Sequence, residues 1–188
     1  MALPSRDECR AALRGFAALL RGDAQALRSF DLSVEGFWRS FWPSLLLTIP
    51  YVLLLPAADP SMPDDAGAII GQGLLQLVIW FIYLAVMLVF CRAFGLTARY
   101  SVFVILYNWG QAVLLLATLP VLALTAAGLL PAGVPQGWAG LLLLVWLFAV
   151  TRMARIGLGA EQGNFAGNSG DIRHLPNTRI KVHPHVPR

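Results

Sequence analysis

Charged residues are scarce in this chain. They make up 13% of its 188 residues, whereas hydrophobic residues make up 57%. A soluble domain carries about a quarter charged residues, so the deficit indicates a protein whose solvent is a lipid bilayer. The net charge of +4 does not indicate a nucleic-acid partner, because no basic groove or aromatic binding motif accompanies it and cations commonly flank membrane spans.

Cysteine and histidine are also rare, with two and three copies. Cys9 and Cys91 form no CxxC pair, and both fall on the side assigned below to the cytoplasm, so we expect no disulfide. An inert thiol and a palmitoylated thiol both remain open. His183 and His185 form an HxH pair without a carboxylate or thiol partner. The other candidate metal ligands share one loop that lacks the EF-hand spacing: Asp59, Asp64 and Asp65. We expect neither a metal nor a cofactor.

Catalytic motifs are missing as well. The sequence contains no HExxH and no GxSxG, and no histidine or acidic residue lies inside an apolar segment. The ionisable groups near the ends of those segments are mainly arginines, which keep their proton and serve poorly as acids or bases. The sequence therefore predicts a protein that is not an enzyme.

Four long apolar segments are present instead. A helix needs about 20 apolar residues to cross a bilayer, and the four segments run roughly over residues 37–56, 68–91, 101–127 and 138–153. They predict an all-α fold: an integral membrane four-helix bundle preceded by a cytoplasmic amphipathic helix. The expected divisions are an interfacial segment, a membrane domain and a flexible cytoplasmic tail, over residues 1–36, 37–157 and 158–188.

The first 30 residues have the pattern of an amphipathic helix. Ser5 and Glu8 are spaced as a capping box. One stripe is apolar: Cys9, Leu13, Phe16, Leu20 and Leu27. A neighbouring stripe is basic: Arg6, Arg10, Arg14, Arg21 and Arg28. Such a helix suits the headgroup layer of a membrane with anionic lipid. The alternative is that it packs against a partner protein or against the base of the bundle itself.

The distribution of basic residues predicts the orientation. All fourteen Lys and Arg residues precede the first apolar segment or border its start, lie between residues 92 and 99, or follow from Arg152 onward. Because cytoplasmic loops carry the excess of Lys and Arg, we expect four spans with both termini in the cytoplasm. The residues expected at the membrane interface are Arg10, Arg14, Arg21, Trp38, Arg39, Trp42, Arg92, Arg99, Arg152 and Arg155.

The third span carries two amides, Asn108 and Gln111, which share one helix face. An amide facing lipid would cost several kcal/mol, roughly, so this face is expected to meet protein or water. Counting residues inward from the basic end of each span puts polar groups at two depths, about 13 Å and about 18 Å. We call the full set the polar seam: Thr48, Tyr51, Gln76, Trp80, Tyr83, Asn108 and Gln111. We predict that Thr48, Tyr83 and Asn108 contribute to one interhelical hydrogen-bond network, which either holds the helices together or lines a path.

Two stretches carry a resemblance to a known family. RGFAALLRGDAQALRSF near the N-terminus and RYSVFVILYNWGQ in the third span, which has Pro120 towards its far end, resemble the Ypt-interacting (Yip) domain family and its bacterial relatives. The resemblance covers residues 13–156, with four expected spans where the family usually has five. It implies a cytoplasmic N-terminal segment, a compact helical bundle and a role in trafficking or membrane organisation, and it transfers no functional residue.

These observations lead to one functional expectation and one alternative. The expectation is a non-enzymatic membrane protein that scaffolds, organises or assists other membrane components, with the lipid bilayer, other membrane proteins or a second copy as partners. The alternative is a small-molecule transporter or channel that acts as an oligomer, with a polar path along Asn108 and Gln111. A composition rich in Arg and Ala and poor in Lys suits a GC-rich bacterium, so we expect a bacterial inner-membrane location.

Overall fold

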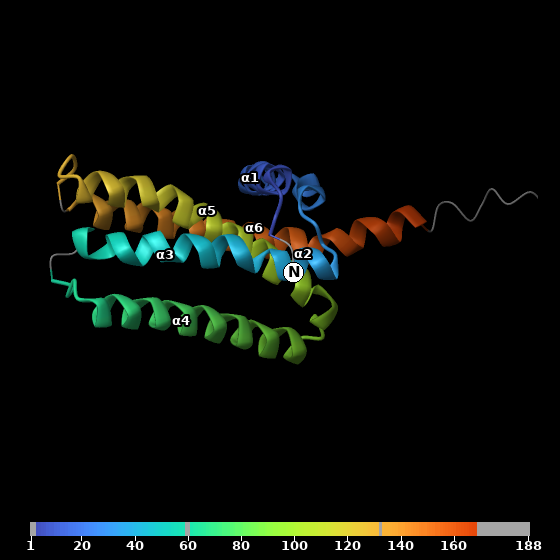
Figure 1. Ribbon diagram of the computed structural model, residues 1–188. Helices are drawn as coiled ribbons and strands as arrows, with labels where there is room; N and C mark the ends of the chain where they lie inside the picture. The colour runs from blue at the N-terminus through green and yellow to red at the C-terminus, as the bar shows by residue number, and fades with distance from the viewer. Residues whose placement is uncertain (1–2, 59–60, 132, 169–188) are drawn as a thin grey trace, which may run out of the picture. The chain divides into compact units, whose positions relative to one another are not determined.

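The computed structural model describes residues 3–58, 61–131 and 133–168, and within them every regular element is helical (Figure 1). The elements are α1 (Arg6–Arg21), η1 (Ala24–Ser29), α2 (Val34–Arg39), α3 (Phe41–Ala58), α4 (Ala66–Ala93), η2 (Thr97–Arg99), α5 (Tyr100–Ala126) and α6 (Val134–Asn168). Four stretches are long and apolar enough to cross a membrane: Val34–Ala58, Ala66–Ala93, Thr97–Ala126 and Val134–Met153. The predicted all-α membrane bundle with a preceding amphipathic helix is confirmed.

The helices extend beyond the predicted spans because capping groups, and not hydropathy alone, set their ends. The first span begins at Val34, where Ser33 Oγ accepts a hydrogen bond from the Gly36 amide at 3.1 Å. The second begins after Asp65, whose carboxylate accepts from two amides of the first turn. The first span is also interrupted at Ser40, between α2 and α3. Pro43 explains this break, because a proline ring clashes with the carbonyl four residues earlier.

The last helix continues past the predicted fourth span to Asn168. The first part of the segment predicted as a flexible tail is therefore helical, which suits the Ala, Arg, Leu, Glu and Gln residues found there. The rest of the predicted tail, residues 169–188, lies outside the described residues.

α5 is the central helix of the bundle. Half of its apolar window is buried, compared with about a fifth or less in each of the other three spans. Its residues from Val104 to Gly110 are all buried, so protein surrounds the helix on every side at this level. Its most extensive neighbour is α3, and α1, α2 and α4 also contact it. α3 also packs against α4, and Figure 1 shows α4 alongside it.

The N-terminal arm, which comprises α1 and η1, packs against this central helix. Phe16 and Leu19 of α1 join Phe30 and residues of α5 and α6 in one apolar core. Of the alternatives for this helix, the structure places its apolar side on the base of the bundle. The buried face is rotated from the predicted stripe: Ala12 and Leu19 are inside, whereas Leu13 is 42% exposed. The reason is close packing, because a Cβ at Gly15 would lie 2.7 Å from Phe30 Cε2.

Gly110 marks the point where α1, α5 and α6 meet. A Cβ at this position would lie 2.7 Å from the Trp146 ring and 3.1 Å from both Met153 Cε and Phe16 Cε2. Only glycine leaves room for these three side chains on the α5 backbone. The docking of the N-terminal arm therefore depends on one small residue of α5 and on two side chains of α6.

α1 is shorter than the helix predicted over residues 1–30. It ends at Gly22, which has φ 81° and caps the helix with its amide. A left-handed backbone of this kind favours glycine. Asp23 then starts η1 by accepting a hydrogen bond from the Gln25 amide at 2.8 Å. The arm is therefore two short elements joined by a turn.

Candidate functional site

The best-defined polar contact in the bundle is centred on Asn108, which is fully buried in α5. Its Nδ2 donates a hydrogen bond to Ser40 Oγ at 2.9 Å. Ser44 Oγ in turn donates to the Asn108 backbone carbonyl at 2.8 Å. Ser40 Oγ also donates to the Phe37 carbonyl at 2.7 Å, so its one proton is already used. We call these three side chains, Asn108, Ser40 and Ser44, the Asn108 cluster; it ties α5 to the first span.

Sequence reasoning did not single out Ser40 and Ser44. Both serines are at least as buried as most of the apolar core, with 0% and 2% of their surface exposed. The available signal was their spacing, because residues four apart lie on one helix face, and that face also holds Thr48. A serine is short, however, and its sequence pattern alone does not separate an interhelical donor from one bonded to its own helix.

Thr48 does not reach Asn108 directly. Its Oγ1 donates to the Ser44 carbonyl at 2.8 Å, within its own helix. The predicted register is therefore displaced by one turn, with Ser44 opposite Asn108. The count assumed that Arg39 and Arg99 lie at equal depth. Arg39 is instead held by ion pairs with two carboxylates of the N-terminal arm and its linker, so its position does not report the headgroup level.

Tyr83 lies in an aromatic cluster and not in the hydrogen-bond network. Its ring stacks on Tyr107 with the centroids 4.5 Å apart and the planes inclined by 17°. Tyr107 in turn meets Trp146 edge-on at 5.2 Å. The described residues give Tyr83 no hydrogen-bond partner. Tyr51 is half-buried and joins neither group within the same ranges. These two members of the predicted polar seam are therefore not brought to the Asn108 cluster.

Apart from Asn108, Tyr51 and Tyr83, the members of the polar seam line a small cavity between α3, α4 and α5. These four members are Thr48, Gln76, Trp80 and Gln111. The volume of the cavity is about 10 Å³. The lining residues are Ser44, Thr48, Gln76, Leu77, Trp80 and Gln111. Four of these six side chains carry a hydroxyl or an amide, so the lining combines polar and apolar groups. Trp80 is 6% exposed and packs on Phe41 at 5.6 Å between ring centroids.

Two buried polar atoms here have no partner among the described residues: Asn108 Oδ1 and Trp80 Nε1. A buried group left without a hydrogen bond costs about 1–3 kcal/mol. For Asn108 the amide orientation is fixed, since Ser40 Oγ already donates its proton elsewhere and must accept from Nδ2. The carbonyl oxygen of the side chain is therefore the atom left over.

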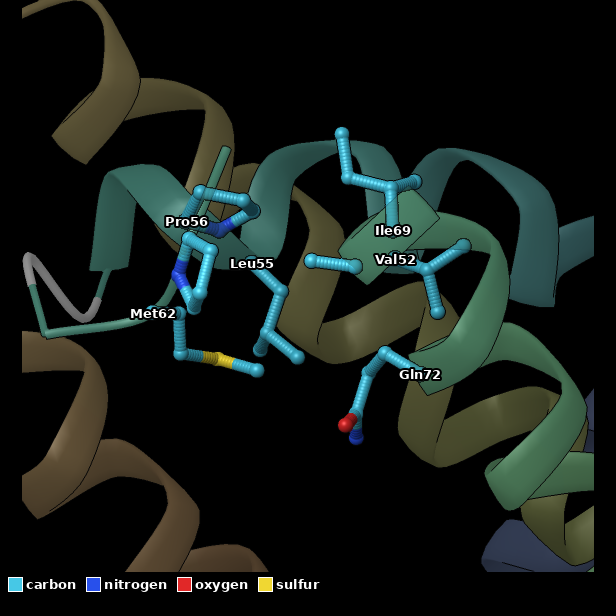
Figure 2. Close-up of a pocket in the computed structure, with 8 residues that line it drawn as sticks. Val52, Leu55, Pro56, Met62, Ile69 and Gln72 are labelled. Carbon is cyan, nitrogen blue, oxygen red and sulfur yellow. The ribbon is translucent and has the colours of Figure 1, made fainter. Parts of the chain in front are cut away.

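A larger cavity lies between α3 and α4, at the end of these helices away from the Arg92–Arg99 loop (Figure 2). Its volume is about 180 Å³. The lining residues are Val52, Leu55, Pro56, Met62, Pro63, Ala68, Ile69 and Gln72. Gln72 supplies the one polar side chain among them. Such a lining suits an apolar or weakly polar occupant.

The predicted interface residues separate into two groups. Most of the arginines and Trp38 lie on the surface: Arg10, Arg14, Arg21, Trp38 and Arg92 are exposed, and Trp42 and Arg99 are half-buried. Arg39 and Arg152 hold the N-terminal arm. The side chain of Arg155 lies outside the described residues.

Arg39 joins the arm and its linker to α2. Its guanidinium pairs with Asp31, and its Nε lies 3.5 Å from Glu8 Oε1. The second contact is an ion pair without hydrogen-bond geometry, since neither atom has a hydrogen-bond partner in the described part of the chain. Hydrogen bonds from Ser33, together with Arg39, lower the pKa of Asp31 below its usual value. We call Arg39, Asp31 and Glu8 the arginine clamp.

Arg152 supports the other end of α1. A Cβ at Gly22 would lie 2.7 Å from its Nη1, so the guanidinium sits against the C-terminal end of the helix. A cation there is favoured by the helix dipole, typically by about 0.3–1 kcal/mol. The same guanidinium lies 5.0 Å from the centroid of the Phe148 ring. Arg152 therefore has a packing role within the fold.

Within the described ranges, no group of three or more His, Cys, Asp or Glu side chains is placed to hold a metal ion. The polar groups of the Asn108 cluster and of the small cavity are amides, hydroxyls and an indole, which are uncharged near neutral pH and bind by hydrogen bonds. Their chemistry is that of holding helices and of binding neutral polar molecules.

Comparison with known proteins assigns no family to this chain. No family model matches it, and no curated protein or solved structure is detectably similar to it.

Proposed function

We propose that this protein is a non-enzymatic, multi-pass membrane protein that scaffolds, organises or assists other membrane components. The observation that carries the proposal is the closed packing around α5. Every residue from Val104 to Gly110 is buried, the Asn108 cluster links α5 to the first span, and the N-terminal arm covers the same level. Such an interior maintains a shape and leaves the outer faces of the spans for lipid or other proteins.

The test is purification in a mild detergent, with mass spectrometry of the co-eluting proteins. The control is an unrelated four-span protein with the same tag and expression level. We expect one or a few membrane proteins to be enriched at defined stoichiometry, or a discrete homo-oligomer by light scattering. A preparation that contains only monomers, with the same background as the control, would remove the accessory-subunit role.

We further propose a bacterial inner-membrane location with both termini in the cytoplasm. The support is the one-sided distribution of Lys and Arg in the sequence. In the described residues, the arginines of the N-terminal arm, Arg39 and Arg152 also gather near one end of the bundle, where the arm docks. The loop between α3 and α4 carries aspartates and no basic residue.

The orientation can be tested with two engineered cysteines in a Cys9→Ser, Cys91→Ala background. Ala66→Cys at the start of α4 and Ala98→Cys between α4 and α5 are both at exposed positions. In intact cells, a membrane-impermeant maleimide should label the first and spare the second until the membrane is opened. The reverse pattern would contradict the proposed orientation.

The small cavity favours one second candidate, a transporter or channel that acts as an oligomer. Gln111 lines this cavity, and Asn108 lies one turn earlier on the same helix. If solute passes along these amides, reconstituted Asn108→Leu protein should lose flux relative to wild type. Unchanged flux in this variant, with the wild type active, would exclude Asn108 from the path.

We also infer that the outer face of the N-terminal arm binds anionic lipid. Arg10, Arg14 and Arg21 share a helix face and are exposed, while the apolar side of α1 is occupied by the bundle. The span Thr97–Ala126 has 30 residues, about 45 Å of helix, which exceeds a hydrocarbon core of about 30 Å. The helix is therefore long enough to extend beyond the hydrocarbon core, and we propose that it does so at the end where the arm docks.

A further inference from the structure

The small cavity between α3, α4 and α5 has the size and the chemistry of a site for one water molecule. Its volume of about 10 Å³ is about that of one water-sized probe sphere, roughly the minimum that a water requires. Four side chains that carry a hydroxyl or an amide line it, on three different helices, together with Leu77 and the Trp80 ring. Empty cavities in proteins are typically lined by apolar groups alone, whereas this lining combines polar and apolar groups.

Trp80 adds an independent observation. It lines the cavity and is 6% exposed, and its Nε1 has no hydrogen-bond partner among the described residues. An indole N–H can only donate, and buried donors are nearly always paired with protein or with ordered water. The hydroxyls of Ser44 and Thr48 already donate to backbone carbonyls, but each keeps acceptor capacity. The amides of Gln76 and Gln111 form no hydrogen bond within the described part of the chain.

We propose that one ordered water molecule occupies this cavity, accepts a hydrogen bond from Trp80 Nε1 and bonds to the side-chain amides of Gln76 and Gln111. It joins α4 to α5, two helices that otherwise meet mainly through aromatic and aliphatic side chains. The water satisfies the buried indole donor and joins it to two half-buried amides, so polar groups of two helices become one connected network.

The larger cavity lies next to this water site along the same helices. Gln72 and Gln76 are four residues apart on α4, and Val52 and Thr48 are four residues apart on α3. The first member of each pair lines the large cavity of Figure 2, and the second lines the small one. The two cavities are therefore successive levels of the same interface between α3 and α4, about one helical turn apart.

The proposal can be tested by solution NMR of the full chain in detergent micelles with ¹⁵N-labelled tryptophan. Trp80→Phe keeps the ring packing and identifies the Trp80 indole signal by its loss. We expect a cross-peak between the Trp80 indole proton and water in wild type. Trp38, which is 49% exposed, supplies the positive reference. The double variant Gln76→Leu, Gln111→Leu should lose the water cross-peak of Trp80 and keep that of Trp38.

Thermal stability supplies a second measurement that does not depend on spectral quality. If water accepts from the indole, Trp80→Phe should lower the Tm of the wild type, and it should raise the Tm or leave it unchanged in the Gln76→Leu, Gln111→Leu background. A Trp80→Phe variant that is more stable than wild type would show that the indole N–H was left unpaired and would overturn the proposal. A Trp80 cross-peak to water that persists in the double variant would overturn the assignment of the two amides.

Discussion

At the scale of single residues, two neighbouring positions of α5 are constrained for different reasons. One is polar and incompletely satisfied: Asn108 uses its nitrogen and leaves its side-chain oxygen without a described partner. The other is steric, because Gly110 has no room for a side chain. Both lie on the same turn of α5, so single substitutions can separate a polar contribution from a packing contribution.

For Asn108, replacement by leucine should cost little. Asn108→Leu keeps the branched shape, removes one hydrogen bond to Ser40 and also removes the unpaired oxygen, and these two effects oppose each other. We expect its unfolding free energy to lie within about 1 kcal/mol of wild type, whereas Asn108→Ala should lose about 1–3 kcal/mol because it also leaves a void. Denaturant unfolding in micelles measures both. A leucine variant that is less stable than the alanine variant would contradict this balance.

For Gly110, any Cβ should be harmful. Gly110→Ala forces a methyl group against Trp146, Met153 and Phe16, which should cost about 1–3 kcal/mol as overpacking. The matched control is Gly140→Ala on α6, where no atom lies within 4 Å of the added Cβ; it should be neutral or stabilise the helix by up to about 1 kcal/mol. Thermal unfolding followed by circular dichroism compares the two. Equal Tm values for Gly110→Ala and Gly140→Ala would contradict the close contact of α1, α5 and α6 at Gly110.

At the scale of elements, the N-terminal arm is the part whose attachment is most specific. Its apolar side packs on α5 and α6, the arginine clamp holds one end, and Arg152 lies against the other. Cys9 is half-buried next to this core, and burial together with the charge of Glu8 raises the pKa of its thiol. The reactivity of Cys9 therefore reports whether the arm is docked.

Release of the arginine clamp should expose this thiol. In a Cys91→Ala background, Arg39→Gln is expected to accelerate alkylation of Cys9 by iodoacetamide several-fold at neutral pH. The raised pKa means that less thiolate is present in the docked state. The midpoint of the pH–rate profile for alkylation should therefore lie above the pKa of a free cysteine, near 8.5, and should move back towards that value in the variant. The control is Arg92→Gln, an exposed residue outside the clamp. Identical profiles in Arg39→Gln and Arg92→Gln would exclude a role of the clamp in docking.

The arginine clamp should also make docking of the arm sensitive to acid. Because the pKa of Asp31 is lowered in the folded state, its contribution is present above the unfolded value of about 3.9 and is lost as the pH falls through the lower folded value. Spin labels at Arg28→Cys and Ala98→Cys, both exposed positions, should keep their docked separation at pH 5 and separate only below about pH 3.9. In Asp31→Asn this transition should vanish; an unaltered transition would assign it to another group.

Much of this arrangement follows from the sequence, but not its register. The four apolar segments and the amphipathic start are set by composition and by period, and both are in the structure. Asn108 and Gln111 were identifiable because amides are costly in an apolar span. Their partners were not: the break at Ser40 and the ion pairs of Arg39 displace the first span by one turn relative to a count from its basic end. Side-chain direction at Leu13 and Tyr83 is likewise set by tertiary packing, which no local period encodes.

At the scale of the whole molecule, the described spans pack around α5 and expose largely apolar side chains. The exposed large side chains on α4 and α6 are mostly Leu, Ile, Val and Phe, as expected where lipid is the solvent. The exposed arginines of α1 contribute a polar, basic surface at one end. This division supports the proposed membrane location and the proposed contact with anionic headgroups.

The lipid contact can be measured on the purified protein. The triple variant Arg10→Gln, Arg14→Gln, Arg21→Gln removes three charges, each of which is worth about 1 kcal/mol near an anionic surface. It should retain several-fold less phosphatidylglycerol relative to phosphatidylethanolamine, as quantified by lipid mass spectrometry. Arg92→Gln, a basic residue outside the arm, serves as the control. A lipid ratio in the triple variant equal to that of the control would place the anionic-lipid contact elsewhere.

The three-way crossing at Gly110 has a consequence for the order of biosynthesis. Phe16 packs in one cluster with Met153 and Ala149 of α6, so α1 cannot complete its docking until α6, which follows it in the chain, has been made and inserted. Until then the apolar face of α1 lacks its α6 neighbours. Docking of the arm is thus a late event in folding, and a docked arm indicates that α6 has inserted.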